Sequence, residues 1–77
     1  AAHRYVKLAD ALCGAMGRTL GRVTAGRVRR IGFRQRLVWT FTTTDGGRFG
    51  MVDRGKTADA LDDGMRRVAR IDARGIE

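Results

Sequence analysis

The sequence predicts a two-layer α+β domain in the order α-β-β-β-α, a three-stranded antiparallel meander with both helices packed on one face. Three observations predict this fold. Both ends of the chain carry apolar residues at spacings of three and four, the period of an amphipathic helix. The middle of the chain alternates apolar and polar residues, the period of a strand. An Asp45-Gly46 pair between two alternating runs marks a tight hairpin. Residues 1–77 are therefore expected to form a single small basic domain.

The first helix is expected to end near Gly17, because glycine tolerates the left-handed conformation that closes a helix. Its apolar side would consist of Tyr5, Leu8, Ala9, Leu12, Cys13, Ala15 and Met16. This side should pack against a sheet.

Three strands are expected to follow. An early strand lies within residues 21–34, and there Arg29, Ile31 and Phe33 alternate with Arg30, Gly32 and Arg34. The clearest strand is 36–43, and the return strand is 48–52. The face covered by the helices would carry Leu37, Trp39, Phe41, Phe49 and Met51. Trp39 and Phe41 could instead stack on unpaired bases, but sharing a face with Leu37 favours core packing.

The last segment is expected to be a second amphipathic helix that begins at a Thr57 cap. Its apolar stripe would be Ala58, Leu61, Met65, Val68 and Ile71. Acids fill its first half and arginines its second half, an order that suits the helix dipole.

Charge is the strongest functional signal. Seven arginines and no acid lie between Asp10 and Asp45, and they supply most of the formal net charge of +8. Such a positive field on a small rigid surface indicates a polyanionic partner, most often nucleic acid. Arginine outnumbers lysine fourteen to two. Phosphate recognition and a GC-rich genome both explain that ratio, but genome composition does not explain the absence of acids from residues 11–44.

The face of the sheet opposite the helices is the expected nucleic-acid site. It would present Arg30, Arg34, Arg36, Thr40, Thr42 and Arg48, with Arg54 just beyond. Arginine binds phosphates or guanine edges, and threonine bonds phosphates or contacts thymine methyl groups. A ribbon of strands is also narrow enough to enter a major groove. The alternative is that arginine and threonine are ordinary residues of a solvent-exposed strand face.

Two family resemblances follow from the element order. Three strands and then the capped stretch Thr57-Ala58-Asp59-Ala60-Leu61 resemble the AP2-type and integrase arm-binding domains over residues 20–74. That resemblance implies a three-stranded sheet laid in the major groove of DNA.

The full αβββα order is also similar to the double-stranded RNA-binding domain. That family clamps phosphates with lysines at the start of its second helix. The matching stretch here, residues 55–59, has one lysine, Lys56, and then turns acidic. Small ribonuclease toxins of this topology rely on a strand histidine, whereas the single histidine here is His3.

Other function classes find little support in the residues. The sequence offers no Ser-His-Asp or Cys-His pairing and no phosphate loop, so we expect no enzyme and no cofactor. One histidine and one cysteine cannot make a metal site. A single cysteine fits a cytoplasmic setting. No apolar run approaches about 18 residues and no leader peptide is recognised, so no membrane association is expected.

The sequence thus predicts a small basic nucleic-acid-binding protein, with duplex DNA favoured over RNA. By analogy with other small basic proteins, it would be a regulatory or accessory factor of a phage or mobile element. The alternative is a protein-interaction module, an adaptor or inhibitor that docks its basic face or a sheet edge on an acidic protein surface. A second alternative is binding to double-stranded RNA. A homodimer interface could supplement so small a core.

Overall fold

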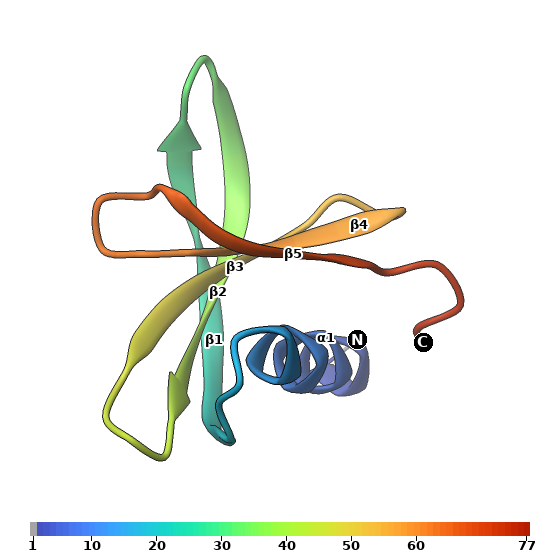
Figure 1. Cartoon of the computed structure of the whole chain (residues 1–77). Helices are drawn as coiled ribbons and strands as arrows, with labels where there is room; N and C mark the ends of the chain where they lie inside the picture. The colour runs from blue at the N-terminus through green and yellow to red at the C-terminus, as the bar shows by residue number, and fades with distance from the viewer. Residues whose placement is uncertain (1) are drawn as a thin grey trace.

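The computed structural model describes residues 2–77 as one helix followed by five strands (Figure 1). The elements are α1 (Ala2–Ala15), β1 (Leu20–Ile31), β2 (Arg34–Thr43), β3 (Arg48–Asp53), β4 (Thr57–Leu61) and β5 (Arg67–Asp72). The strands form one antiparallel sheet in the order β1-β2-β3-β4-β5. The helix described here is not long and apolar enough to cross a membrane.

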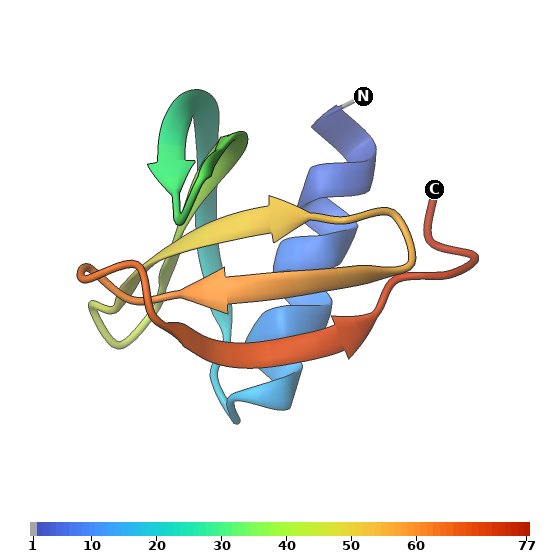
Figure 2. The ribbon, with the colours of Figure 1, turned by 90° about the horizontal axis from the view of Figure 1, so that it is seen from above.

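The predicted α-β-β-β-α arrangement, with two helices on a three-stranded meander, is wrong. The stretch assigned to a second helix forms β4 and β5, joined by a turn in which Met65 has a positive φ of 63° and donates a backbone hydrogen bond to Asp62. Both family resemblances required a helix there, so the fold that each implied is wrong as well. Among residues 2–77, α1 alone covers the sheet (Figure 2).

The physical reason is that residues 57–61 satisfy two periods at once. As a strand, they bury Ala58 and Ala60 beneath α1 and turn Asp59 and Leu61 to the opposite face. Pairing with β3 on one side and β5 on the other also satisfies the backbone polar groups. Gly64 within a helix would have cost about 1 kcal/mol relative to alanine, whereas a turn accommodates it.

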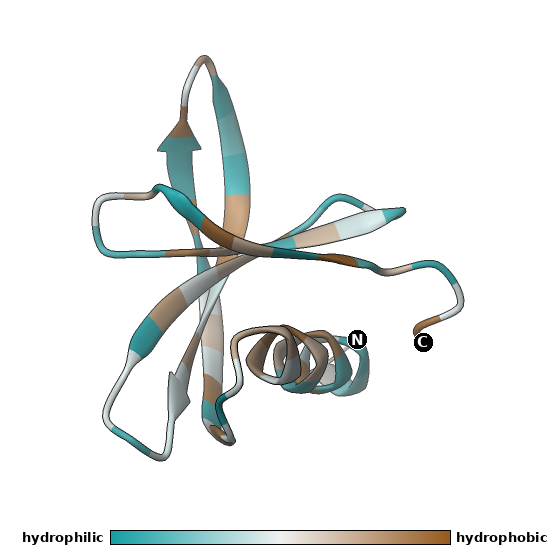
Figure 3. Cartoon of the chain, in the orientation of Figure 1, coloured by the Kyte–Doolittle hydropathy of each residue, from teal (hydrophilic) through white to brown (hydrophobic). Residues whose placement is uncertain are grey.

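The main core lies between α1 and the sheet, as the apolar side of the first helix predicts. Leu8, Leu12 and Cys13 are fully buried against Phe41 and Met51. The hydropathy colouring shows apolar residues along α1 and at the centre of the sheet (Figure 3). The chain turns with a positive φ of 70° at Gly17, which confirms the predicted end of the helix.

The edge of this core differs from the prediction. Trp39 and Phe49 are only partly buried, and Leu37 is 48% exposed although it was expected to be covered. Tyr5 of α1 stacks on Trp39 with ring centroids 4.3 Å apart, so that the helix covers the sheet as far as Trp39. Beyond Trp39, β1 and β2 extend further, and α1 does not cover this part of the sheet.

A second, smaller apolar cluster lies on the opposite face of the sheet. Val38, Val52 and Leu61 are buried there, and Ile31 and Met65 pack against them. The face expected to be open is therefore partly closed by its own side chains.

Arg4 ties the start of α1 to the far end of the sheet. Its Nε donates to Asp53 Oδ2 at 2.7 Å and its Nη2 donates to Asp53 Oδ1 at 3.2 Å. It also donates to the carbonyl oxygens of Gly55 and Ile76. The hydrogen bonds from Arg4 hold the pKa of the Asp53 carboxyl below its usual value.

Asp59 is a buried carboxylate on the face opposite α1, 1% exposed. Arg54 Nε donates to it at 2.8 Å, and Arg70 donates through Nε at 2.6 Å and Nη2 at 3.2 Å. Burial alone raises the pKa of Asp59, but the hydrogen bonds from Arg70 and Arg54 outweigh burial, so the pKa is lowered overall.

Acid is therefore expected to destabilise the fold. The lowered pKa values of Asp59 and Asp53 mean that the unfolded chain takes up protons more readily than the folded chain. The contribution of these carboxylates is complete above their ordinary pKa of 3.8 and is lost as the pH falls through the lower folded-state value. The Tm should drop between about pH 5 and about pH 2, and the Asp59→Asn variant should show a smaller drop.

At neutral pH, Asp59→Asn should destabilise the protein by about 2 kcal/mol, because two arginines lose a shared partner but remain partly hydrated. Asp72→Asn is the matched control, since its contact with Arg74 is exposed and 3.9 Å long. Urea denaturation of the two variants measures the difference. Equal losses in the free energy of unfolding would show that the ion pairs of Asp59 with Arg54 and Arg70 do not stabilise the sheet.

Candidate nucleic-acid interface

The sheet extends into a two-stranded arm. β2 pairs with β3 only from Val38 to Thr42, so residues 28–37 pair only with one another; we call these residues, together with Arg27 at their base, the arm. Figure 1 shows the arm rising past β3, β4 and β5 on the side away from α1. A β-hairpin thus extends beyond β3, and on one of its faces Ile31 packs against the cluster of Val38, Val52 and Leu61.

A β-bulge lies at the root of the arm. Thr24 pairs with Thr40 and Arg27 pairs with Val38, so β1 has one more residue here than β2. A bulge bends its strand and increases the twist, which turns the arm away from the body. At Gly26 in the bulge, an added Cβ would lie 3.0 Å from Trp39 Cδ1 and 3.1 Å from Leu37 Cδ1. Glycine therefore allows the close approach that fixes the direction of the arm.

The tip of the arm is a two-residue turn. Ile31 pairs with Arg34, and between them Gly32 has a φ of 65° and is followed by Phe33. A positive φ at the first central position is the requirement of a type II′ hairpin turn. Phe33 packs against nothing and is 102% exposed.

The register of β1 and β2 decides which arginines share a face. Arg29 lies directly opposite Arg36, and Ile31 lies opposite Arg34. Strand alternation then places one row of polar and basic residues on the face away from α1: Arg27, Arg29, Arg34, Arg36, Thr40, Thr42 and Arg48. Arg30 pairs with Gln35 and lies on the other face of the arm. Like charges directly opposite each other destabilise a hairpin, so the Arg29–Arg36 pair is kept against a free-energy cost.

Ion pairing divides the arginines into two groups. Within residues 2–77, six arginines lie within 4.0 Å of a carboxylate: Arg4, Arg18, Arg54, Arg66, Arg70 and Arg74. No such partner is found there for the other eight, which are Arg22, Arg27, Arg29, Arg30, Arg34, Arg36, Arg48 and Arg67. Five of these eight belong to the arm. The uncompensated positive charge is concentrated where the protein is most exposed.

The remaining predicted site residues lie nearer the body. Arg54 donates a hydrogen bond to the buried Asp59 at 2.8 Å, so this arginine contributes to the fold. Thr42 Oγ1 accepts a hydrogen bond from the backbone N–H of Arg22 at 3.2 Å. Thr40 is half-buried, and its carbonyl oxygen accepts from the Thr24 hydroxyl at 3.0 Å. Both threonines thus stand at the base of the arm, where they join β1 to β2.

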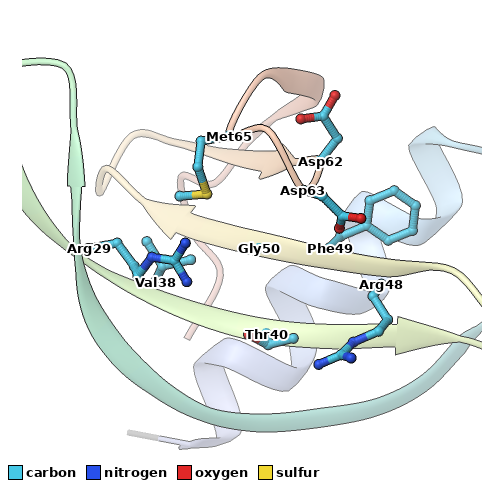
Figure 4. A pocket seen from close by; sticks show the side chains of 9 residues that line it. All are labelled: Arg29, Val38, Thr40, Arg48, Phe49, Gly50, Asp62, Asp63 and Met65. Atoms are coloured by element: carbon cyan, nitrogen blue, oxygen red, sulfur yellow. The ribbon is translucent and has the colours of Figure 1, made fainter.

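A cavity of about 310 Å³ lies between the root of the arm and the turn 62–66 (Figure 4). Arg29 and Arg48 stand on one side, and Asp62 and Asp63 stand on the other. The two carboxylates would repel a phosphate, so the cavity itself is a poor polyanion site. Among residues 2–77 no three His, Cys, Asp or Glu side chains are grouped to hold a metal ion.

Comparison with known proteins gives no guide to function, since no family model, curated protein or solved structure matches the chain.

Sequence reasoning missed Arg27, Arg29 and Phe33. It continued one strand alternation through residue 34 and so placed Arg29, Ile31 and Phe33 together on one face. The turn at Gly32 interrupts that alternation. A glycine followed by one residue between two alternating runs is itself a sign of a two-residue hairpin, and that signal would have found the tip.

Substitution of Gly26 by valine should disturb the arm. The new side chain would press on Trp39 and Leu37, and overpacking of this kind costs about 1–3 kcal/mol. Thermal unfolding and Trp39 fluorescence would both report the change. Gly14→Ala is the control: no atom lies within 4 Å of an added Cβ there, and alanine in a helix should stabilise by up to about 1 kcal/mol. An unchanged Tm and unchanged Trp39 emission in Gly26→Val would show that this contact does not set the arm.

Proposed function

We propose that the protein binds duplex DNA through the arm, with the arginines of its basic face set against the phosphate backbone. The observation that carries the proposal is the division of the arginines: within residues 2–77, six of the nine outside the arm are paired with carboxylates, and none of the five in the arm is. Charge without an internal partner is available to an external one, and an arginine that binds a DNA phosphate releases the cation condensed on that phosphate.

The dimensions of the arm suit a duplex. Its two strands lie about 4.8 Å apart, and a two-stranded ribbon fits the major groove of B-DNA, which is about 12 Å wide. Arginines two residues apart on one face are about 6.8 Å apart, which matches the axial rise of about two phosphates along one DNA strand. The major groove of an RNA duplex is deep and narrow, and side chains cannot read it, which favours DNA.

The electrostatics of the arm support the same function. Arg29 and Arg36 repel each other in the free protein, and no carboxylate in residues 2–77 lies within 4.0 Å of either. A phosphate between the two guanidinium groups would turn this repulsion into shared attraction. Binding should therefore neutralise the charge of the arm.

A protein partner is the second candidate, and one observation favours it. Val28 and Leu37 form a cross-strand pair on the other face of the arm, 62% and 48% exposed. Beside Arg30, this apolar pair would suit an acidic protein surface with a hydrophobic centre. The two candidates use opposite faces of the arm, so that substitutions can separate them.

The double variant Arg29→Gln/Arg36→Gln tests the DNA proposal. Fluorescence anisotropy with a labelled duplex, measured over a series of salt concentrations, should show weaker binding and a salt slope smaller by about two. The control is Arg66→Gln/Arg74→Gln, which removes the same charge from two exposed arginines that have carboxylate partners. Its affinity should stay within about twofold of the unaltered protein.

Equal losses in the two double variants would mean that net charge alone drives binding, and the arm would then have no special role. Binding that is abolished instead by Val28→Ala/Leu37→Ala in a pull-down with a protein partner would support the second candidate.

A further inference from the structure

The ring of Phe33 has no role in the fold. Phe41 is fully buried and Phe49 packs against the core, whereas Phe33 stands at the far end of the arm with no neighbour. The type II′ turn needs its glycine at position 32 but places no demand for an aromatic residue at the next position. The exposed ring is large and stands on a two-residue turn directly beside the unpaired Arg34, so it is placed to contact whatever the arginines of the arm bind.

We propose that Phe33 is a wedge that inserts between neighbouring base pairs of the duplex and kinks it. The inference rests on the proposed function, because the arginines of the arm must first hold the DNA. In proteins that enter the minor groove and bend DNA, apolar side chains of this size, including phenylalanine, partly unstack base steps, and Phe33 would do so from the major groove.

The arm is long enough to deliver the ring. Val38 is the first residue of β2 that pairs with β3, and Phe33 lies five residues before it. At about 3.4 Å per residue the tip stands about 17 Å along β2 from Val38, roughly twice the 8.5 Å depth of the major groove. Ile31 packs against the cluster of Val38, Val52 and Leu61, so the turn that carries Phe33 is the part of the arm that projects into the groove.

The charges near the tip are arranged to support insertion. Arg34 follows Phe33 directly, and Arg36 and Arg29 lie one alternation further back on the same face. Guanidinium groups at these positions would hold the phosphates that flank the opened step. The paired strands and two-residue loop also keep the ring at a fixed position, which limits the conformational entropy lost on insertion.

A lipid surface fits the tip less well. Phe33 is the one fully exposed apolar side chain at the end of the described arm, because Ile31 packs against the second apolar cluster and Val28 and Leu37 lie near the root. A membrane-binding element needs a continuous apolar face, whereas a wedge needs a single ring.

The test compares Phe33→Ala with Val28→Ala, which also removes an exposed apolar side chain from the arm but not from its tip. The probe is a DNA duplex that carries 2-aminopurine at internal steps and a fluorophore pair at its ends. The unaltered protein should raise 2-aminopurine emission severalfold and bring the ends closer together. Phe33→Ala should bind about tenfold more weakly, with the same salt slope, and should leave the duplex stacked and straight. Val28→Ala should behave as the unaltered protein does.

The outcomes separate the two proposals. If the unaltered protein fails to bind the duplex, the proposed function and the wedge both fall. If it binds, and Phe33→Ala unstacks and bends the duplex equally well, the wedge alone is wrong. Binding to phosphatidylglycerol–phosphatidylcholine vesicles that depends on Phe33, without any unstacking of DNA, would overturn the wedge in favour of a lipid surface.

Discussion

The rest of the structure depends on one constraint, the small number of carboxylates in the chain. The ion pairs of Asp59 with Arg54 and Arg70 show how these few carboxylates are used. The chain has eight acids against sixteen lysines and arginines, and all eight acids lie outside residues 11–44. The short ion pairs therefore form in the body, where Asp53 holds Arg4 and Asp59 holds Arg54 and Arg70. These contacts join α1, the end of β3 and the β4–β5 hairpin. The arm receives none of this compensation.

Stability and charge are consequently divided between two parts of one sheet. The body contains both apolar clusters, one under α1 and one around Val38, Val52 and Leu61. The arm is held by the β1–β2 ladder and by the bulge at its root, and at its tip only Ile31 reaches an apolar cluster. Because the body supplies the folding free energy, the arm can retain mutually repelling arginines and an exposed aromatic ring. Residues that oppose folding and persist on a rigid surface are characteristic of a binding site.

The sequence predicts the local elements whose signals come from neighbouring residues. The first helix, its end at Gly17 and the hairpin at Asp45-Gly46 are all found in the structure. Residues 57–72 could not be assigned in the same way, because Ala58, Leu61 and Met65 satisfy the helical period and only pairing with β3 selects the strand. Strand alternation predicts the correct face of the sheet for Arg34, Arg36, Thr40, Thr42 and Arg48. It places Arg29 and Arg30 on each other's faces, because the turn at Gly32 was not recognised. Arg54 belongs to the clamp on Asp59, a partnership set by tertiary contact between the β3–β4 loop and β4.

The acids nearest the arm favour one orientation of the duplex relative to the protein in the proposed complex. Asp62 and Asp63 stand across the cavity from Arg29 and Arg48, with the turn 62–66 forming one wall. A duplex laid flat over the whole face would bring its phosphates against these carboxylates, and that repulsion would offset part of the attraction of the arginines. A duplex met by the end of the arm avoids them. The same placement that weakens the body as a DNA surface therefore favours approach through the tip, where Phe33 stands.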